Sequence, residues 1–131
     1  MTADLYARRK AQSRISIFKV IFPNTTNHYD TLFGGKAMEI MDEAAFISAT
    51  RFSRKKVVTI SSDKIDFKEP IPAGTIVELV AEVVEVGNTS MKVQVDLFRE
   101  EMYSDTPQRK AISGLFTFVA LDKNNQKISV L

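Results

Sequence analysis

The stretch from Asn27 to Thr50 reads NHYDTLFGGKAMEIMDEAAFISAT and decides the fold. It begins as a polar loop, passes through Gly34 and Gly35, and continues as a run that leaves almost no polar stripe. A helix that is apolar nearly all round has to be buried on most of its surface. We therefore predict one long helix that starts at the two glycines, ends between Thr50 and Ser53, and is enclosed by the rest of the chain.

Two adjacent acids, Asp42 and Glu43, interrupt this apolar run. Residues three, four and seven apart share one face of a helix, so Asp42 lies on an apolar face with Met38, Ala45 and Ala49. Glu43 lies on a more polar face, where we expect it to be solvated or paired locally. A carboxylate kept from water is costly unless donors hold it or it has a chemical task, such as that of a general base. Asp42 is therefore the main catalytic candidate, and a structural acid held by backbone donors is the alternative.

The composition limits the possible functions. With 131 residues, of which 44% are hydrophobic, the chain predicts one domain over residues 1–131. A net charge of +2, from 18 basic and 16 acidic residues, does not require a nucleic acid or membrane partner. The absence of cysteine excludes disulfides and thiol nucleophiles, and the single histidine, His28, excludes a multi-histidine metal site. Residues 1–13 predict a short helix or a mobile arm without the apolar core of a secretory signal, so we expect a cytoplasmic protein.

The rest of the chain predicts β-strands separated by turn residues. The expected strands cover residues 14–22, 57–67, 75–86, 89–100 and 109–121, with a hairpin at Gly87 and Asn88, a possible bulge at Gly114, and a short edge at residues 128–131. The alternation in residues 89–100 is the clearest in the chain and predicts one buried face. A helix followed by consecutive hairpins favours an α+β fold, a curved antiparallel sheet around one long helix. Dimerisation by sheet extension would cover an exposed edge of this sheet.

Several motifs in this order resemble the acyl-coenzyme A thioesterases of the hot-dog fold, in particular the bacterial and brain-type acyl-CoA hydrolases. The matching segments are PNTTN at 23–27, TLFGG at 31–35, MDEAA at 41–45, SDKIDF at 62–67 and VGNTSMKV at 86–93. The resemblance covers about Val20 to Asp122. It implies hydrolysis of acyl-CoA to free acid and CoA, a homodimer with a continuous sheet, and assembly of such dimers into a hexamer. It also implies no cofactor, because coenzyme A is part of the substrate, and no metal.

The resemblance assigns catalytic roles to Asn27 and Asp42. The helix start adds Gly35, whose free backbone N–H would polarise the thioester carbonyl. Asp42 lies seven residues further on, about 10 Å along the helix axis, so the base for that carbonyl should come from a second subunit. The remaining candidates are those for binding the substrate and its CoA phosphates, namely Thr59, Gly87, Asn88, Thr89, Ser90, Lys92 and Arg54, with Lys55 and Lys56 as further cations. The family often has glycine where Asp30 stands, and Asp tolerates positive φ better than most residues.

Three alternatives remain open at this point. His28 suggests a hot-dog dehydratase, although the surrounding motif differs from the one in those enzymes. A non-catalytic acyl-CoA sensor would keep the fold but would be expected to lose Asp42. In a hydrolase, Asp42 can act as general base or as nucleophile. Met38, Met41 and Phe46 are candidates for contact with the acyl chain, although helix residues of this type more often belong to a core.

Overall fold

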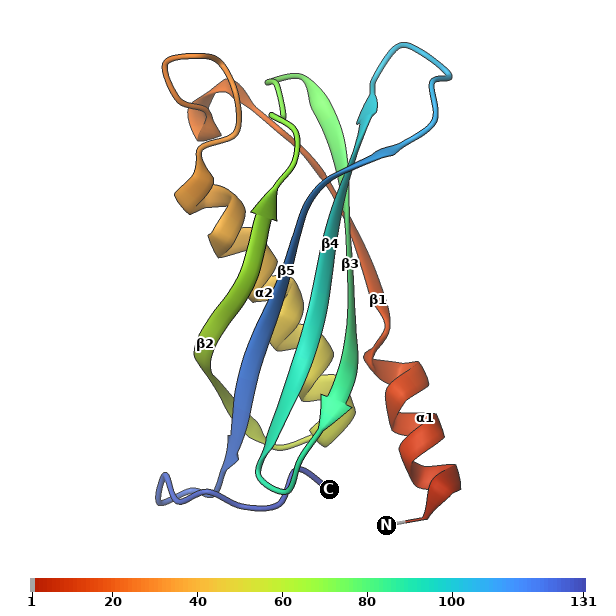
Figure 1. The fold of residues 1–131 in the computed structure, drawn as a ribbon, viewed down its shortest axis with the longest axis vertical. Helices are drawn as coiled ribbons and strands as arrows, with labels where there is room; N and C mark the ends of the chain where they lie inside the picture. Colours follow the sequence, from red (N-terminus) through yellow and green to blue (C-terminus); the bar gives the residue numbers. More distant parts are fainter. Residues whose placement is uncertain (1) are drawn as a thin grey trace.

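The computed structural model describes residues 2–131. It has two layers, a β-sheet and the long helix that the sheet encloses (Figure 1). The elements in chain order are α1 (Ala3–Ser13), β1 (Ile15–Val20), a short 3-10 helix (Pro23–Thr25), α2 (Gly34–Ser53), β2 (Lys56–Phe67), β3 (Thr75–Val86), β4 (Ser90–Glu101) and β5 (Arg109–Leu121). The expected long helix and the four long strands are confirmed. Within residues 2–131, no helix combines the length and the apolar character needed to cross a bilayer.

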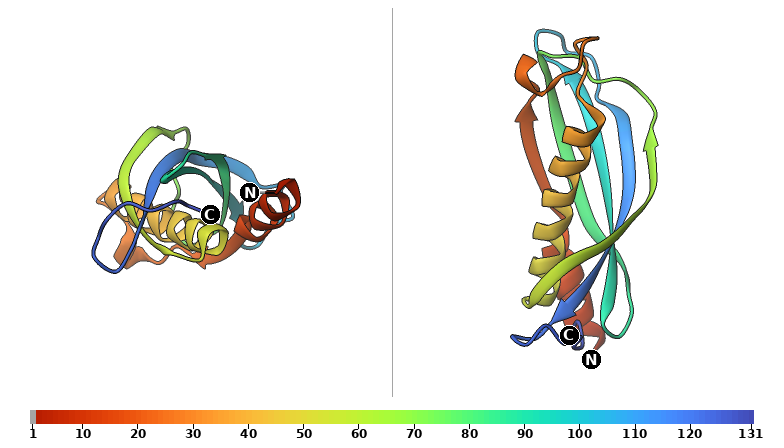
Figure 2. Two further views of the ribbon diagram at one scale, coloured as in Figure 1. Left: turned by 90° about the horizontal axis from the view of Figure 1, so that it is seen from below. Right: turned by 90° about the vertical axis from the view of Figure 1, so that its left-hand side faces the viewer.

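The five strands form one antiparallel sheet in the order β1-β3-β4-β5-β2. Strands β3, β4 and β5 are consecutive hairpin partners, while β1 and β2, which flank α2 in the chain, add to opposite edges. The sheet curls around α2, which runs along its concave side (Figures 1 and 2). The predicted α+β fold, with one long helix wrapped by a curved sheet, is therefore confirmed.

The core lies between α2 and the concave face of the sheet. The alternation predicted for β4 is confirmed, because Met91, Val93, Val95 and Leu97 are at most 1% exposed. The helix contributes Ala37, Met41, Ala44, Ala45, Ala49 and Phe52, all of which are fully buried. Small alanines on α2 let the sheet approach the helix closely, and each buried aliphatic side chain contributes about 1.5–3 kcal/mol to folding.

The first segment is a helix. Thr2 caps α1 by accepting a hydrogen bond from the Leu5 N–H at 3.1 Å. The side chain of Arg9 donates to the Phe52 carbonyl at 2.7 Å, and the Tyr6 ring packs edge-on against the Phe52 ring. These contacts hold α1 against the C-terminal end of α2, so of the two expectations for residues 1–13, the helix is the correct one over residues 3–13. Met1 lies outside the described residues.

Two local expectations are wrong. Gly114 remains in register with Val95, and the bulge lies instead in the neighbouring strand β2, where the register shifts between Asp63 and Asp66. Gly114 is required there for space, because a Cβ at this position would collide with the Ile65 side chain. Residues 128–131 add no strand. The Val130 N–H donates to the Asn88 carbonyl at 2.9 Å, and this bond fixes the terminal segment beneath the β3–β4 hairpin.

Candidate active site

The N-terminus of α2 offers uncapped backbone donors. Its N-cap residue, Phe33, makes no side-chain cap hydrogen bond, and the Ala37 N–H closes the first helical turn by donating to the Phe33 carbonyl at 2.9 Å. The N–H groups of the preceding helical residues have no acceptor within the helix, as in every helical first turn. A Cβ at Gly35 would lie 2.8 Å from the Phe33 ring, so any larger residue would displace this ring from the helix start. The helix start can therefore receive a carbonyl oxygen or an oxyanion.

Asn27 organises the loop that leads into this helix. Its side-chain Oδ1 accepts hydrogen bonds from the Tyr29 N–H at 2.9 Å, the Thr31 N–H at 3.3 Å and the Thr31 hydroxyl at 3.1 Å. Backbone N–H groups can only donate, which identifies this atom as the amide oxygen. The Nδ2 group makes no hydrogen bond within residues 2–131. Asn27 can therefore act on a ligand only as a donor.

Asp30, where the family often has glycine, adopts φ 60°. Its carbonyl accepts the Ala73 N–H at 2.9 Å, so the turn is joined to the β2–β3 connection. The expectation that an aspartate would tolerate this left-handed position is confirmed.

Asp42 faces the edge strand β2. It is half-buried, and its carboxylate accepts a hydrogen bond from the Thr59 hydroxyl at 2.8 Å. This bond fixes the orientation of the carboxylate and leaves its remaining lone pairs available. Glu43, the next residue, is exposed and points to the other side of the helix, where it lines a hollow with Lys19 and Phe22 beside β1. The two acids therefore face opposite edges of the sheet.

A shallow depression of about 290 Å³ joins the helix start to Asp42. It is lined by Gly35, Met38, Glu39, Asp42, Thr59, Ser62 and Phe116. Gly35 and Asp42 share one helix face, since seven residues are nearly two full turns, and they are separated by about 10 Å along the axis. Glu39 is held by Lys36 through an ion pair of 3.3 Å. The depression brings Gly35, Asp42 and Thr59 together, whereas Asn27 does not line it.

Sequence reasoning had not anticipated the contact between Thr59 and Asp42, nor the presence of Ser62 and Glu39 in the depression. The signal in the sequence is the polar run Thr59-Ile60-Ser61-Ser62 inside an otherwise β-branched strand. His28 lies outside the depression, exposed and stacked on Tyr29. Met41 is fully buried in the core, so it is not free to contact a substrate.

The remaining candidates gather at the other end of the molecule. The hairpin formed by Gly87, Asn88, Thr89 and Ser90 lies at the end of the sheet that holds the C-terminus of α2 and Arg54 (Figure 1). Two of its backbone carbonyls form hydrogen bonds within the chain: the Asn88 carbonyl accepts the Val130 N–H, and the Thr89 carbonyl accepts the Ala120 N–H. Within one chain, this hairpin and Arg54 are therefore distant from Gly35.

The four basic side chains proposed to bind the CoA phosphates differ in their partners within the chain. Lys55 donates to the Ser129 carbonyl at 2.6 Å, Lys56 to the Asn125 side chain at 2.5 Å, and Lys92 pairs with Glu85 at 3.9 Å. Arg54 is exposed, and its guanidinium makes no hydrogen bond or ion pair within residues 2–131. Its backbone adopts φ 55° as the C-cap of α2. Arg54 is therefore the candidate most available to an anionic ligand.

Comparisons with known proteins show the family to which the chain belongs. The model of the thioesterase superfamily matches residues 29–105. An uncharacterized acyl-CoA thioester hydrolase of Zymomonas mobilis is 40% identical over 111 residues, which are 85% of this chain and 74% of that protein. An acyl-CoA hydrolase from Staphylococcus aureus, solved with butyryl coenzyme A, coenzyme A and coenzyme A disulfide, superposes with a TM-score of 0.87 at 35% identity, over 92% of this chain and 73% of that one.

Two further findings concern variants of this enzyme and the assembly of another relative. The Staphylococcus aureus enzyme has also been solved as three variants, in which a threonine, an aspartate or an asparagine is replaced by alanine. An apo-hexameric acyl-CoA thioesterase superposes with a TM-score of 0.87 at 31% identity, over 92% of this chain and 76% of that one. The expected resemblance in sequence and fold is confirmed, and the chain belongs to the thioesterase superfamily, in its group of hot-dog acyl-CoA hydrolases.

Proposed function

We propose that this protein hydrolyses acyl-CoA thioesters to a free carboxylic acid and coenzyme A. The observation that carries the proposal is the depression in which an oriented carboxylate, Asp42, and the uncapped start of α2, at Gly35, share one helix face. Hydrolysis of a thioester needs a group that activates water and donors that stabilise the oxyanion, and these two features supply them.

The two groups act in one site across a two-fold dimer. If two α2 helices run antiparallel about a two-fold axis near Met38 and Glu39, Gly35 of one helix lies opposite the partner subunit's Asp42. Met38 and Glu39 lie midway between Gly35 and Asp42 in the helix and line the depression. Strand β2 supports this arrangement, since it is an edge strand with Val58, Ile60 and Phe67 between 38% and 56% exposed. Pairing β2 with its copy would satisfy the open edge and bury these side chains. We extend the proposal to a hexamer of three such dimers, since one relative of the same fold is a hexamer.

In the proposed reaction, the thioester carbonyl oxygen accepts the Gly35 N–H of one subunit, while the partner subunit's Asp42 takes a proton from water. The hydroxide adds to the carbonyl carbon, the tetrahedral intermediate collapses, and the C–S bond breaks. The thiolate of CoA then receives the proton from Asp42. Asn27, whose amide oxygen is occupied within its turn, donates through Nδ2 to the water or to the carbonyl. Direct attack by Asp42 gives the same products through an anhydride that water then cleaves.

In this proposal, the guanidinium of Arg54 binds the phosphates of CoA. Arginine presents several donors to phosphate oxygens, and Arg54 is the basic candidate without an internal partner. In the antiparallel dimer, the C-terminal end of one α2 lies beyond the N-terminal end of the other, so Arg54 reaches toward the partner's substrate.

The test is release of free thiol from acyl-CoA by the purified protein, followed with a thiol-reactive dye. We expect one thiol and one carboxylic acid per acyl-CoA consumed, with acyl chains of several lengths. Binding of acyl-CoA without thiol release would instead identify a non-catalytic sensor. Hydration of an enoyl-CoA without thiol release would identify a hydratase. Either result would overturn the proposal.

A further inference from the structure

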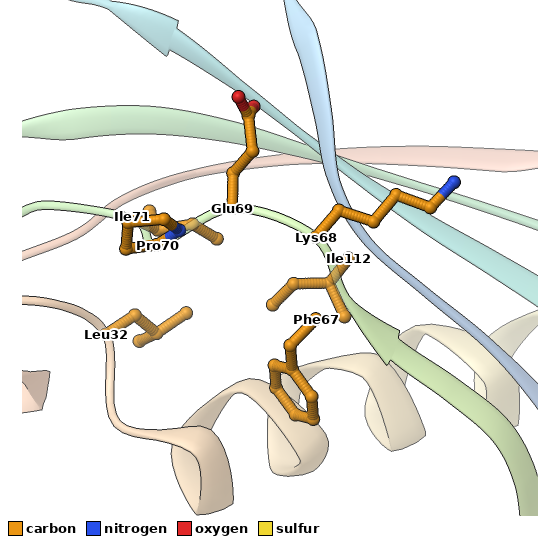
Figure 3. A pocket seen from close by; sticks show the side chains of 7 residues that line it. All are labelled: Leu32, Phe67, Lys68, Glu69, Pro70, Ile71 and Ile112. Atoms are coloured by element: carbon orange, nitrogen blue, oxygen red, sulfur yellow. The ribbon is translucent and has the colours of Figure 1, made fainter.

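A second cavity adjoins the start of α2. It has a volume of about 270 Å³ and is lined by Leu32, Phe67, Lys68, Glu69, Pro70, Ile71 and Ile112 (Figure 3). The Phe67 ring lies 3.9 Å from the position that a Cβ on Gly34 would occupy, so this ring stands between the cavity and the residue next to Gly35. Leu32, on its other side, is two residues before the helix. The proposed reaction does not use this space.

The side chains that surround the space are apolar. In Figure 3, Leu32, Ile71, Ile112 and Phe67 enclose it, whereas the charged ends of Lys68 and Glu69 point away from it. Arg99 and Arg109 hold the Glu69 carboxylate, the former at 3.6 Å. The depression at Asp42 contains two carboxylates and two hydroxyls beside Met38 and Phe116. The cavity differs from it, because none of the described residues that line the cavity directs a carboxylate or hydroxyl into its interior.

The walls of the cavity are fixed by main-chain hydrogen bonds. The Leu32 N–H donates to the Ile71 carbonyl at 2.7 Å and joins the loop before α2 to the β2–β3 connection. The Lys68 and Glu69 N–H groups both donate to the Ala111 carbonyl, at 2.8 and 3.2 Å, and join the same connection to β5. Because three segments are tied together, the cavity is already formed before a ligand enters.

We propose that this cavity binds the acyl chain of the substrate, so that each carbon of the chain adds to its binding until the cavity is filled. The inference rests on the proposed function, in which the Gly35 N–H holds the thioester carbonyl. The acyl chain and the CoA arm leave the carbonyl carbon in different directions, and the cavity offers a preformed apolar surface close to the helix start that can receive a hydrocarbon. A volume of 270 Å³ holds roughly nine groups of about 30 Å³, the size of a water molecule, so the cavity is filled by a chain of about ten carbons when the carbonyl carbon outside it is counted.

Phe67 sets the outer limit of the cavity. Its side chain is 53% exposed, whereas Leu32, Ile71 and Ile112 are at most 9% exposed, so Phe67 forms the outer wall and the other three form the interior. It is also the last residue of β2, the edge expected to pair with the partner. Removing its ring opens the cavity toward the proposed dimer interface without removing a side chain from the core of one chain.

The test compares kcat/KM for a series of acyl-CoAs from acetyl to dodecanoyl. For the parent protein we expect a rise of about fourfold per methylene, equivalent to about 0.8 kcal/mol for each buried CH₂, until a plateau near ten carbons. Leu32→Trp fills the cavity and should lower the octanoyl-to-acetyl ratio at least thirtyfold. Leu5→Trp, on α1 at the other end of the molecule, is the matched control and should leave the ratio unchanged.

Phe67→Ala provides the second variant if Leu32→Trp does not fold. It should move the plateau to longer chains and raise the dodecanoyl-to-octanoyl ratio about tenfold. A folded Leu32→Trp protein with the parental ratio, or a Phe67→Ala protein with the parental plateau, overturns the assignment of the cavity while leaving thioester hydrolysis intact. A parent protein that releases no thiol from any acyl-CoA overturns the proposed function, and the inference with it.

Discussion

The two edges of the sheet are built differently. Strand β1 is short, and its six residues pair with β3 in one continuous register. Strand β2 has twelve residues, two register shifts against β5, and side chains that are exposed at ten positions. α2 presents Glu43 toward β1 and Asp42 toward β2. In the proposed dimer, β1 closes the fold of one chain, whereas β2 is the edge at which the site and a second copy meet.

The largest effect should come from the two acids of α2. We expect Asp42→Asn to lower kcat at least a hundredfold, because an amide cannot accept the proton of water, while the fold and assembly persist. Glu43→Gln, the matched change toward β1, should retain activity within about threefold, which corresponds to under 1 kcal/mol of barrier. Steady-state rates and sedimentation of both variants check this. Equal losses in the two would mean that the two edges are not functionally distinct.

A charge placed on each edge separates their structural roles. Ile60 on β2 and Phe18 on β1 are 56% and 60% exposed, so Ile60→Lys and Phe18→Lys alter equally accessible positions. An unpaired charge is costly in a buried interface, so Ile60→Lys should dissociate the dimer and lower activity about thirtyfold or more. Phe18→Lys should leave the dimer intact. Light scattering across a dilution series measures both. A stable, active Ile60→Lys dimer would place the two-fold interface elsewhere.

Each edge also carries one hydroxyl that is bonded to a carboxylate. Thr59 donates to Asp42 on the β2 side, and Ser16 donates to Glu78 on the β1 side. Thr59→Val should lower kcat about tenfold with little change in KM, because the loss of a hydrogen bond to a charged group, worth about 1.5 kcal/mol, leaves Asp42 poorly oriented. Ser16→Ala should not alter the kinetics. A Thr59→Val enzyme with the parental kcat would show that Asp42 needs no such support.

The smallest effect should come from the arginines that precede the two edge strands. Arg14 and Arg54 are the C-caps of α1 and α2, but Arg14 pairs with Glu82 at 3.7 Å and Arg54 has no partner in the described chain. Arg54→Asn suits the left-handed backbone and should raise KM about fivefold for acyl-CoA, but not for an N-acetylcysteamine thioester, which has no phosphates. Arg14→Asn should change neither KM. Equal shifts for both substrates would show that Arg54 does not serve the phosphates.

The sequence predicts the parts of this fold that depend on local periodicity. The bounds of β3 and β5 and the buried face of β4 follow from alternating or continuous apolar residues, and α2 follows from its apolar run after Gly34. The order of the strands does not follow in this way, because β2 reaches the outer edge only through its pairing with β5, about fifty residues away. The position of the bulge was missed for the same reason, since the space at Gly114 is occupied by Ile65 from another strand.

The candidate site likewise contains residues that the local sequence predicts and residues that only the tertiary structure brings together. Asp42 and Gly35 could be selected from the helix alone, because the first is an acid on an apolar face and the second begins the helix. The bond from Thr59 to Asp42 joins residues seventeen apart on different elements, and the cavity beside Gly34 is formed by three segments. Such contacts depend on tertiary packing, which one-dimensional patterns do not contain.

The measurement that tests the shared site most directly is complementation between two inactive variants. Asn27→Asp keeps the oxygen that three donors require within the turn but removes the Nδ2 donor, so it damages the Gly35 side of the site without disrupting the loop. Asp42→Asn damages the other side. In dimers reassembled from an equal mixture, half the molecules are mixed, and each contains one intact site beside one doubly damaged site.

We therefore predict that the mixture, unfolded and refolded together, regains about a quarter of the parental activity, while each variant refolded alone remains nearly inactive. Native mass spectrometry on subunits of different isotopic mass confirms that mixed dimers have formed. Mixed dimers without any recovery of activity would place Asn27 and Asp42 in the site of a single subunit, and would contradict the assignment of Gly35 and the partner's Asp42 to one reaction.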